Sequence, residues 1–356
     1  MICHSGPTCP AGSEAISEIT SPDLSRDRDD KVRKKFMKSK FKYAIGVDLG
    51  GSSIKLGIVT NTGKLIKKIS IRTEAEKGPK KVIANLVSGI NELMDKSNYK
   101  ITGIGIGCPG VVTPGKGIVE NPPNLSGWEK VNIGKIICGE FKRPVFVDND
   151  ANAAAIGELT FGSGKKYKSF IMITLGTGVG GGIVINEKIY HGDFGAAGEI
   201  GHISIDYNGP KCNCGSYGCI EAYAGNLYLR ERVRAELKKH PKSKMWKLIN
   251  NDLSKVSPRN IQDAAESGDA FAKSVIDELG MHLGSAFASL CNVLDISVFI
   301  IGGGIAGFGK PLFDSIKKTI SRRVMAPIRP RVRVLPAKLK NDAGIKGASA
   351  LVFHHN

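Results

Sequence analysis

The strongest chemical signal in the sequence is a set of one histidine and three cysteines, His202, Cys212, Cys214 and Cys219. One imidazole and three thiolates form a soft four-coordinate donor set, which is typical of a closed structural zinc site. The Cys-x-Cys pair is spaced more tightly than in most zinc fingers, and a disulfide pair or incidental reduced cysteines are the alternatives. The sequence therefore predicts a zinc-binding loop over residues 199–221.

Two glutamates, Glu199 and Glu221, stand at the two ends of this loop. A folded zinc loop is rigid, so it would hold both carboxylates around one small volume. If one ring nitrogen of His202 binds the metal, the other is free to hydrogen-bond a neighbour. Two carboxylates and an imidazole suit a neutral ligand with many hydroxyl groups, which indicates a sugar site rather than an anion site.

A glycine-rich turn lies near the start of the first apolar region. An apolar strand leads to Asp48, then to Gly50-Gly51 and Ser52-Ser53, before a second strand begins near Ile54. Such a turn exposes backbone N–H groups to phosphate oxygens, and Asp48 could hold a phosphate-bound Mg²⁺. No Walker motif is present, and a plain glycine-rich hairpin explains this stretch alone equally well.

The same design recurs in residues 169–185. There Thr174-Leu-Gly-Thr aligns with Asp48-Leu-Gly-Gly, 126 residues earlier, and each copy lies between two apolar strands. The repeat predicts a duplicated α/β fold whose two halves hold phosphates in the cleft between them.

A third candidate site is the strand that ends in Asp148-Asn149-Asp150 and runs directly into an alanine-rich helix. Asp150 stands at the expected helix N-cap, so a capping role would explain it. A carboxylate at the end of a strand in an α/β sheet is equally typical of a general base.

Three further features have two readings each. The glycines at 302–304 could let a flat ring approach the backbone, as in an adenine-binding wall, or form a strand-to-helix turn. Asn124 and Trp128 could line a pocket or belong to a surface loop. Cys108 is predicted to be a small buried residue rather than a nucleophile, because nothing near it in the sequence suggests an activating base.

Hydrophobic spacing predicts the main elements and domain boundaries. Helices are expected at residues 79–96, 221–251, 268–294, 310–323 and 343–353. Residues 1–40 are polar and proline-interrupted, which predicts a disordered leader, with Met37 as an alternative start. The domains are expected at residues 41–155 and 156–340, with the terminal helix 341–356 joining the first.

The totals limit the class of protein. The 356 residues suffice for two domains. The net charge of +18 is compatible with a polyanion partner, but the basic residues are spread along the chain without the interleaved aromatics of single-strand binders, so no nucleic-acid partner is expected. No apolar run reaches ~18 residues and no signal peptide is recognisable, so we expect a cytoplasmic protein without a membrane span.

Together these motifs resemble the ROK family of sugar kinases and repressors, and most of all its ATP-dependent bacterial glucokinases. The resemblance covers residues 43 to about 353 and keeps the order VDLGGSSIK, PGVV, DNDANAAAIGE, LGTGVGGGI, GEIGH, CNCGSYGCIE and IGGGI. It implies an actin/hexokinase-like (ribonuclease H-like) fold, with two α/β domains that close on the sugar.

The resemblance also implies roles for the residues that match the motifs. Asp150 would be the general base, and Asn149, Asp150, Glu199, His202, Glu221 and Asn124 would contact the sugar. ATP and Mg²⁺ would lie on Asp48, Gly50, Gly51, Ser52, Lys55, Gly176, Thr177, Gly178, Gly303 and Gly304. A structural Zn²⁺ would be bound by His202, Cys212, Cys214 and Cys219.

Several alternatives stay open within this resemblance. The sugar could be N-acetylmannosamine, mannose, fructose or allose instead of glucose, and polyphosphate could replace ATP as the donor. A sugar-sensing repressor of the same family is the rival from another class. The repressor is disfavoured because the leader is too short and too poor in core residues for a DNA-binding domain. In addition, Asp150 and both phosphate turns are intact. The resemblance further suggests a homodimer or homotetramer.

Overall fold

The structure is a computed structural model that describes residues 42–95 and 97–354. The predicted leader and the alternative start at Met37 lie outside the described residues. Within them the chain forms two compact units. The first comprises residues 42–148 and 348–354, and the second is the uninterrupted stretch 149–347.

A five-stranded sheet forms the centre of the first unit, in the order β3-β2-β1-β4-β8. Its strands are β1 (Tyr43–Leu49), β2 (Ser53–Thr60), β3 (Leu65–Arg72), β4 (Ile101–Cys108) and β8 (Val145–Asn149). β1 pairs antiparallel with β2 and parallel with β4. Most residues of β1, β2 and β4 are buried, and their Val, Ile and Leu residues are interspersed with glycines and with small or polar residues.

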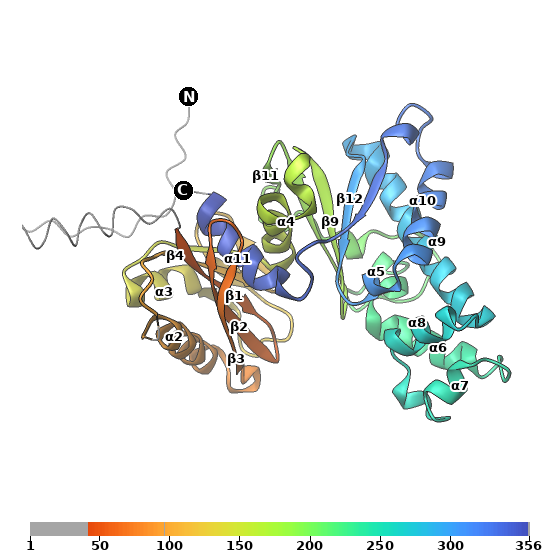
Figure 1. The fold of residues 1–356 in the computed structure, drawn as a ribbon, viewed down its shortest axis with the longest axis horizontal. Coiled ribbons are helices and arrows are strands. Elements are labelled where there is room, and N and C mark those ends of the chain that lie inside the picture. The colour runs from red at the N-terminus through yellow and green to blue at the C-terminus, as the bar shows by residue number, and fades with distance from the viewer. Residues whose placement is uncertain (1–41, 96, 355–356) are drawn as a thin grey trace, which may run out of the picture. The chain divides into compact units, whose positions relative to one another are not determined.

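Helices cover both faces of this sheet (Figure 1). They are α2 (Pro79–Asp95), α3 (Ile133–Phe141) and the end of α11 (Ala343–His354). The predicted helix at 79–96 is confirmed, and its buried residues Val82, Leu86, Ile90 and Leu93 follow the expected 3.6-residue period.

A second, three-stranded sheet was not anticipated from the sequence. It consists of β5 (Val111–Thr113), β6 (Ile118–Glu120) and β7 (Lys130–Asn132). Trp128 precedes β7, is 3% exposed and belongs to the hydrophobic core of the first unit. The suggestion that Trp128 lines a pocket is therefore wrong. Cys108 is fully buried, as predicted.

The second unit repeats the topology of the first, with the sheet order β11-β10-β9-β12-β13. Its strands are β9 (Phe170–Leu175), β10 (Val179–Ile185), β11 (Lys188–Ile189), β12 (Val298–Gly302) and β13 (Arg333–Pro336). β9 pairs antiparallel with β10 and parallel with β12, as β1 does with β2 and β4. The predicted duplication is confirmed.

Seven α-helices lie wholly within the described part of this unit. They are α4 (Asp150–Phe161), α5 (Ile220–Ala224), α6 (Asn226–Leu237), α7 (Met245–Leu248), α8 (Pro258–Glu266), α9 (Ala270–Leu294) and α10 (Lys310–Arg323). The helical region expected over 221–251 is broken into α5, α6 and α7, first at Gly225, where the backbone is extended. Within the described ranges, no helix is both long and apolar enough to cross a membrane.

Candidate active site and metal site

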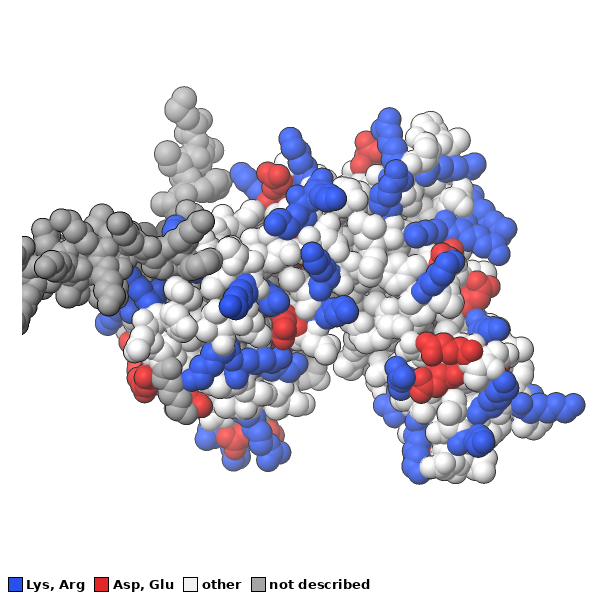
Figure 2. Space-filling model, in the orientation of Figure 1, with Lys and Arg blue, Asp and Glu red and all other residues white. Residues whose placement is uncertain are grey.

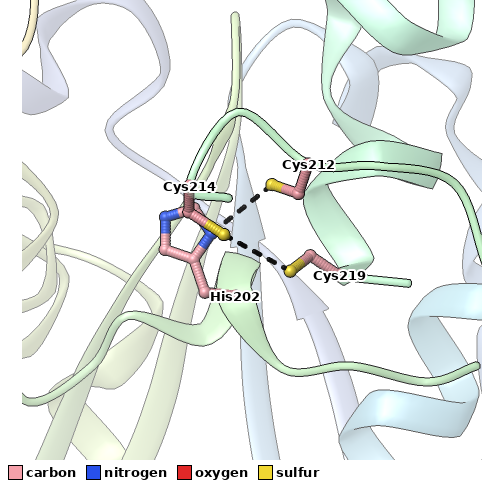
Figure 3. Close-up of side chains that lie close together, drawn as sticks. All are labelled: His202, Cys212, Cys214 and Cys219. Carbon is pink, nitrogen blue, oxygen red and sulfur yellow. Dashed lines mark hydrogen bonds between the residues drawn. The ribbon is translucent and has the colours of Figure 1, made fainter. Parts of the chain in front are cut away.

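The predicted metal ligands come together in the second unit (Figure 3). The four ligand atoms of His202, Cys212, Cys214 and Cys219 lie within 4.8 Å of one another. Cys214 Sγ is 3.6 Å from Cys219 Sγ, and Cys212 Sγ is 3.8 Å from His202 Nδ1. Tetrahedral zinc with Zn–S bonds of about 2.3 Å separates its sulfur ligands by about 3.8 Å. The donor set and its spacing therefore fit zinc.

Short backbone contacts shape the loop that carries these ligands. Cys212 N donates to Ser216 O at 2.8 Å, and an isolated bridge joins Ser204 to Cys219. Gly218 has φ = 67° and packs so closely on Asp206 O that a Cβ would overlap it. Burial and the neighbouring thiols raise the pKa of Cys219 to about 12. A bound cation would replace the proton that this environment favours.

Glu199 and His202 lie on one short turn, η3 (Ile200–His202) with Glu199 as its N-cap. Nδ1 of His202 faces the thiols, and Nε2 lies 4.0 Å from Glu199 Oε2. That distance is too long for a hydrogen bond. Both groups are exposed, so Glu199 and the free ring nitrogen of His202 are available to a ligand with hydroxyl groups.

Glu221, in the first turn of α5, is half-buried and already has a protein partner. Its Oε2 accepts a hydrogen bond from the backbone N–H of Val179 at 2.9 Å, and a Cβ at Gly178 would overlap the same oxygen. Glu221 therefore lies against the turn between β9 and β10. Sequence reasoning missed this contact, because nothing local links residues that are 42 positions apart.

The β9–β10 turn consists of Gly176, Thr177 and Gly178, the residues predicted to face phosphates. Gly176 N donates to Gly178 O at 3.0 Å, and Asn226 N donates to Gly176 O at 3.1 Å. Gly303, with φ = 91°, packs on the backbone of Leu175, where a side chain would overlap. The end of β12 therefore lies beside this turn, and Gly304 next to it is exposed with free space around its Cα.

Three successive glycines in β10 let other segments approach both of its faces. A Cβ at Gly180 or Gly182 would be within 3.3 Å of side chains of Ala151 and Ala155 in α4. A Cβ at Gly181 would overlap the segment that begins at Gly198. The start of α4 and the segment carrying Glu199 thus lie on opposite faces of one strand, next to the β9–β10 turn.

Asp150 is the first residue of α4, and the N-cap is Asn149. Asn149 Oδ1 accepts from Ala151 N at 2.8 Å and from Asn152 N at 3.3 Å. The expectation that Asp150 occupies the N-cap is therefore wrong by one residue. Asp150 Oδ1 accepts from Ala151 N at 2.8 Å, and the residue is exposed. Because Asn149 caps the helix, the position of Asp150 is not explained by capping alone.

The β1–β2 turn of the first unit has a different environment. Thr73, fully buried, donates its hydroxyl to Gly50 O at 2.6 Å and its N–H to Ser52 O at 3.2 Å. Asn124, exposed and with φ = 66°, packs directly on Gly51. Thr73 was not identified from the sequence, because it is an unremarkable residue at the end of a strand.

Asp48 stands next to this turn and opposite Lys55 in the β1–β2 pair. Lys55 Nζ lies 3.8 Å from Asp48 Oδ2. Partial burial raises the pKa of Asp48, while the charge of Lys55 opposes the shift. The carboxylate is a hard oxygen donor of the type that Mg²⁺ prefers, but Lys55 competes with a cation for it.

Known proteins share both the sequence and the fold of this chain. A glucokinase of Thermotoga maritima is 35% identical over 308 residues, which cover 86% of this chain and 96% of that protein. A xylose repressor of Bacillus spizizenii is 31% identical over 88% of this chain and 77% of its own length. A ROK family glucokinase of Streptomyces griseus, solved with glucose and AMPPNP, has 33% identity and a TM-score of 0.76, covering 87% and 98% of the two chains.

These likenesses and the two repeated sheets define an α/β protein with the actin/hexokinase-like fold. The ROK family profile matches residues 44–355. The chain belongs to the ROK family, as its motifs predict.

Proposed function

We propose that this protein is an ATP-dependent hexose kinase that phosphorylates the 6-hydroxyl of glucose. The observation that carries the proposal is that the start of α4, where Asp150 lies, and the segment that carries Glu199 both pack on the glycine-rich strand β10, next to the β9–β10 turn. The similarity to glucokinases over most of the chain supports the same reading.

In the proposed reaction Asp150 accepts the proton of the sugar's 6-hydroxyl as that oxygen attacks the γ-phosphorus of ATP. The new O–P bond forms while the bond to the β-phosphate oxygen breaks, so ADP leaves with its negative charge. A positioned base of this kind contributes a factor of about 10²–10⁴ to the rate. Asn149, Asn124, Glu199, His202 and Glu221 would orient the sugar by hydrogen bonds to its other hydroxyls.

The nucleotide would be held by backbone N–H groups of the two glycine-rich turns. The assigned residues are Gly50, Gly51, Ser52, Lys55, Gly176, Thr177, Gly178, Gly303 and Gly304. Asp48 would hold Mg²⁺ directly or through water, and the ion would neutralise phosphate charge. The zinc site would be structural, because its four protein ligands leave no open position.

A panel of sugars tests this proposal. ADP release with Mg-ATP is measured for glucose, mannose, N-acetylmannosamine, fructose, allose and N-acetylglucosamine. We expect the highest kcat/KM for glucose. A strong preference for another sugar would keep the kinase and correct its substrate. A lack of ADP release with every sugar would contradict the ATP-dependent kinase and favour a polyphosphate donor or, after that, a non-catalytic sugar sensor.

The second candidate is a sugar-sensing repressor, which the similarity to xylose repressors favours. A repressor would bind its sugar without releasing ADP and would shift a promoter fragment in a mobility assay. The proposal also includes a cytoplasmic location and a homodimer or homotetramer. Light scattering of the purified protein measures the oligomeric state, and a monomer would contradict that part.

A further inference from the structure

The contact between Glu221 and Val179 links two parts of the second unit that the proposed function keeps separate. Glu221 belongs to the sugar-binding set, and Val179 ends the turn assigned to phosphate. The carboxylate oxygen of Glu221 accepts the Val179 N–H at 2.9 Å. It lies against Gly178 so closely that any side chain there would collide with it.

The backbone around Glu221 reinforces this link. Gly225 N donates to Glu221 O at 2.8 Å, which closes α5, and a Cβ at Gly225 would lie 3.1 Å from Thr177 O. The next residue, Asn226, donates its N–H to Gly176 O at 3.1 Å. All three residues of the turn, 176–178, therefore contact the segment that begins at Glu221.

The other end of α5 is fixed by the metal loop. Its N-cap is Cys219, one of the four clustered ligands, and Ile220 N donates to Ile203 O at 2.9 Å, next to His202. Glu199 differs from Glu221 in this respect. Within the described part of the chain, the Glu199 carboxylate lies 4.0 Å from His202 Nε2 and makes no hydrogen bond to the β9–β10 turn.

We propose that Glu221 is a positioning residue that sets the conformation of the β9–β10 turn and so couples sugar binding to nucleotide affinity. The inference rests on the proposed function for the identity of the two ligands. A sugar hydroxyl that donates to Glu221 would fix its carboxylate, and the fixed carboxylate would hold the Val179 N–H in place. Because such coupling is reciprocal, bound nucleotide would raise sugar affinity by the same factor.

The test measures binding of AMPPNP by calorimetry, with and without glucose, in Glu221→Ala and in the matched control Glu199→Ala. Loss of a hydrogen bond to a charged group weakens an interaction by about tenfold or more. We therefore expect Glu221→Ala to lower AMPPNP affinity about tenfold in the absence of sugar. Glu199→Ala should lower glucose affinity and leave AMPPNP affinity unchanged.

Two further variants separate positioning from general damage. Glu221→Gln keeps a carbonyl oxygen that can accept from Val179, so it should restore most of the AMPPNP affinity lost in Glu221→Ala. In Gly178→Ala the new methyl group would push the Glu221 carboxylate away from the β9–β10 turn. This variant should therefore weaken glucose binding, although Gly178 is not among the residues assigned to the sugar. Zinc content and melting temperature are measured for each variant.

The outcomes distinguish the inference from the proposed function. If Glu221→Ala changes only the affinity for glucose, and Gly178→Ala changes only the affinity for AMPPNP, the coupling is refuted. The proposed kinase activity would be unaffected by that result. If neither glutamate variant alters glucose binding, the sugar site itself is wrong.

Discussion

The two glycine-rich turns occupy the same place in two sheets of identical topology, yet they are held in different ways. The β1–β2 turn is fixed by Thr73, which follows its own sheet, and by Asn124. The β9–β10 turn is fixed by the segment Glu221–Asn226, which continues from the metal loop. The two sheets share their strand order, whereas the contacts that position each turn come from different segments of the chain.

The two units also differ in the carboxylates that they carry near the turns. The first turn follows Asp48, which is paired with Lys55, and the equivalent residue in the second unit is the neutral Thr174. Asp150 and both loop glutamates belong instead to the second unit. Under the proposed function, the cation-holding carboxylate therefore belongs to the first unit, and the proposed base and both loop glutamates belong to the second.

The largest effect is expected when the proposed base, Asp150, is replaced in the second unit. In Asp150→Asn the amide oxygen can still accept from Ala151 N, so α4 should be retained. The kcat should fall by a factor of about 10²–10⁴ while glucose and AMPPNP binding persist. Steady-state kinetics and calorimetry measure both quantities, and substantial residual turnover would remove Asp150 from the base role.

Removal of the metal should affect the second turn and spare the first. Cys214→Ser, or chelation of the wild type, should release zinc, lower the melting temperature and reduce activity, because the loop that carries Glu199 and Glu221 loses its anchor. Metal analysis, melting curves and ADP release provide the readouts. Cys291→Ala, a buried thiol in α9, serves as the control and should keep its zinc. Active protein without zinc would contradict this account.

A smaller effect is expected from loosening the first turn. Thr73→Val leaves the carbonyl of Gly50 without its hydroxyl donor, at a cost of about 1–2 kcal/mol. The KM for ATP should rise a few-fold with zinc content unchanged. Thr60→Val removes a similarly buried hydroxyl from the β2–β3 hairpin. It should therefore lose as much stability as Thr73→Val but leave the KM for ATP unchanged. Equal changes in the KM for ATP in Thr73→Val and Thr60→Val would show that Thr73 does not affect ATP binding through the β1–β2 turn.

The smallest effect should come from Asn124→Gly, because the left-handed backbone of Asn124 favours asparagine or glycine. Asn124→Gly should leave the melting temperature nearly unchanged, whereas Asn124→Ala should cost about 1–2 kcal/mol of unfolding free energy. If the Asn124 side chain contacts the sugar, both variants should raise the KM for glucose to a similar extent. If the KM for glucose rises only in Asn124→Ala, the variant that loses stability, the role of Asn124 is to pack on Gly51.

Much of the fold could be predicted because its signals are local. The helices α2, α9 and α10 carry a clear 3.6-residue pattern, and the paired turns reveal the duplication through their own residues. The metal ligands were found for the same reason, since three of the four lie within eight residues. The N-cap was misplaced by one residue because Asn149 and Asp150 are both good caps.

What sequence reasoning missed depends on contacts between distant residues. The acceptor role of Glu221 and the hydroxyl of Thr73 on Gly50 follow from tertiary packing. Trp128 looked like a pocket residue because it lies in an irregular, polar stretch. It is buried because it belongs to the hydrophobic core of the first unit, most of whose other members come from distant parts of the chain.

The discontinuity of the first unit has a consequence for synthesis on the ribosome. Gly105 in β4 packs against the backbone of Ala348 in α11, and Gly103 packs on Val352. Ala348 emerges 243 residues after Gly105. Until residues 348–354 have been synthesised, the side of β4 that α11 covers stays exposed. The half that is translated first therefore cannot complete its packing until the second unit has been translated.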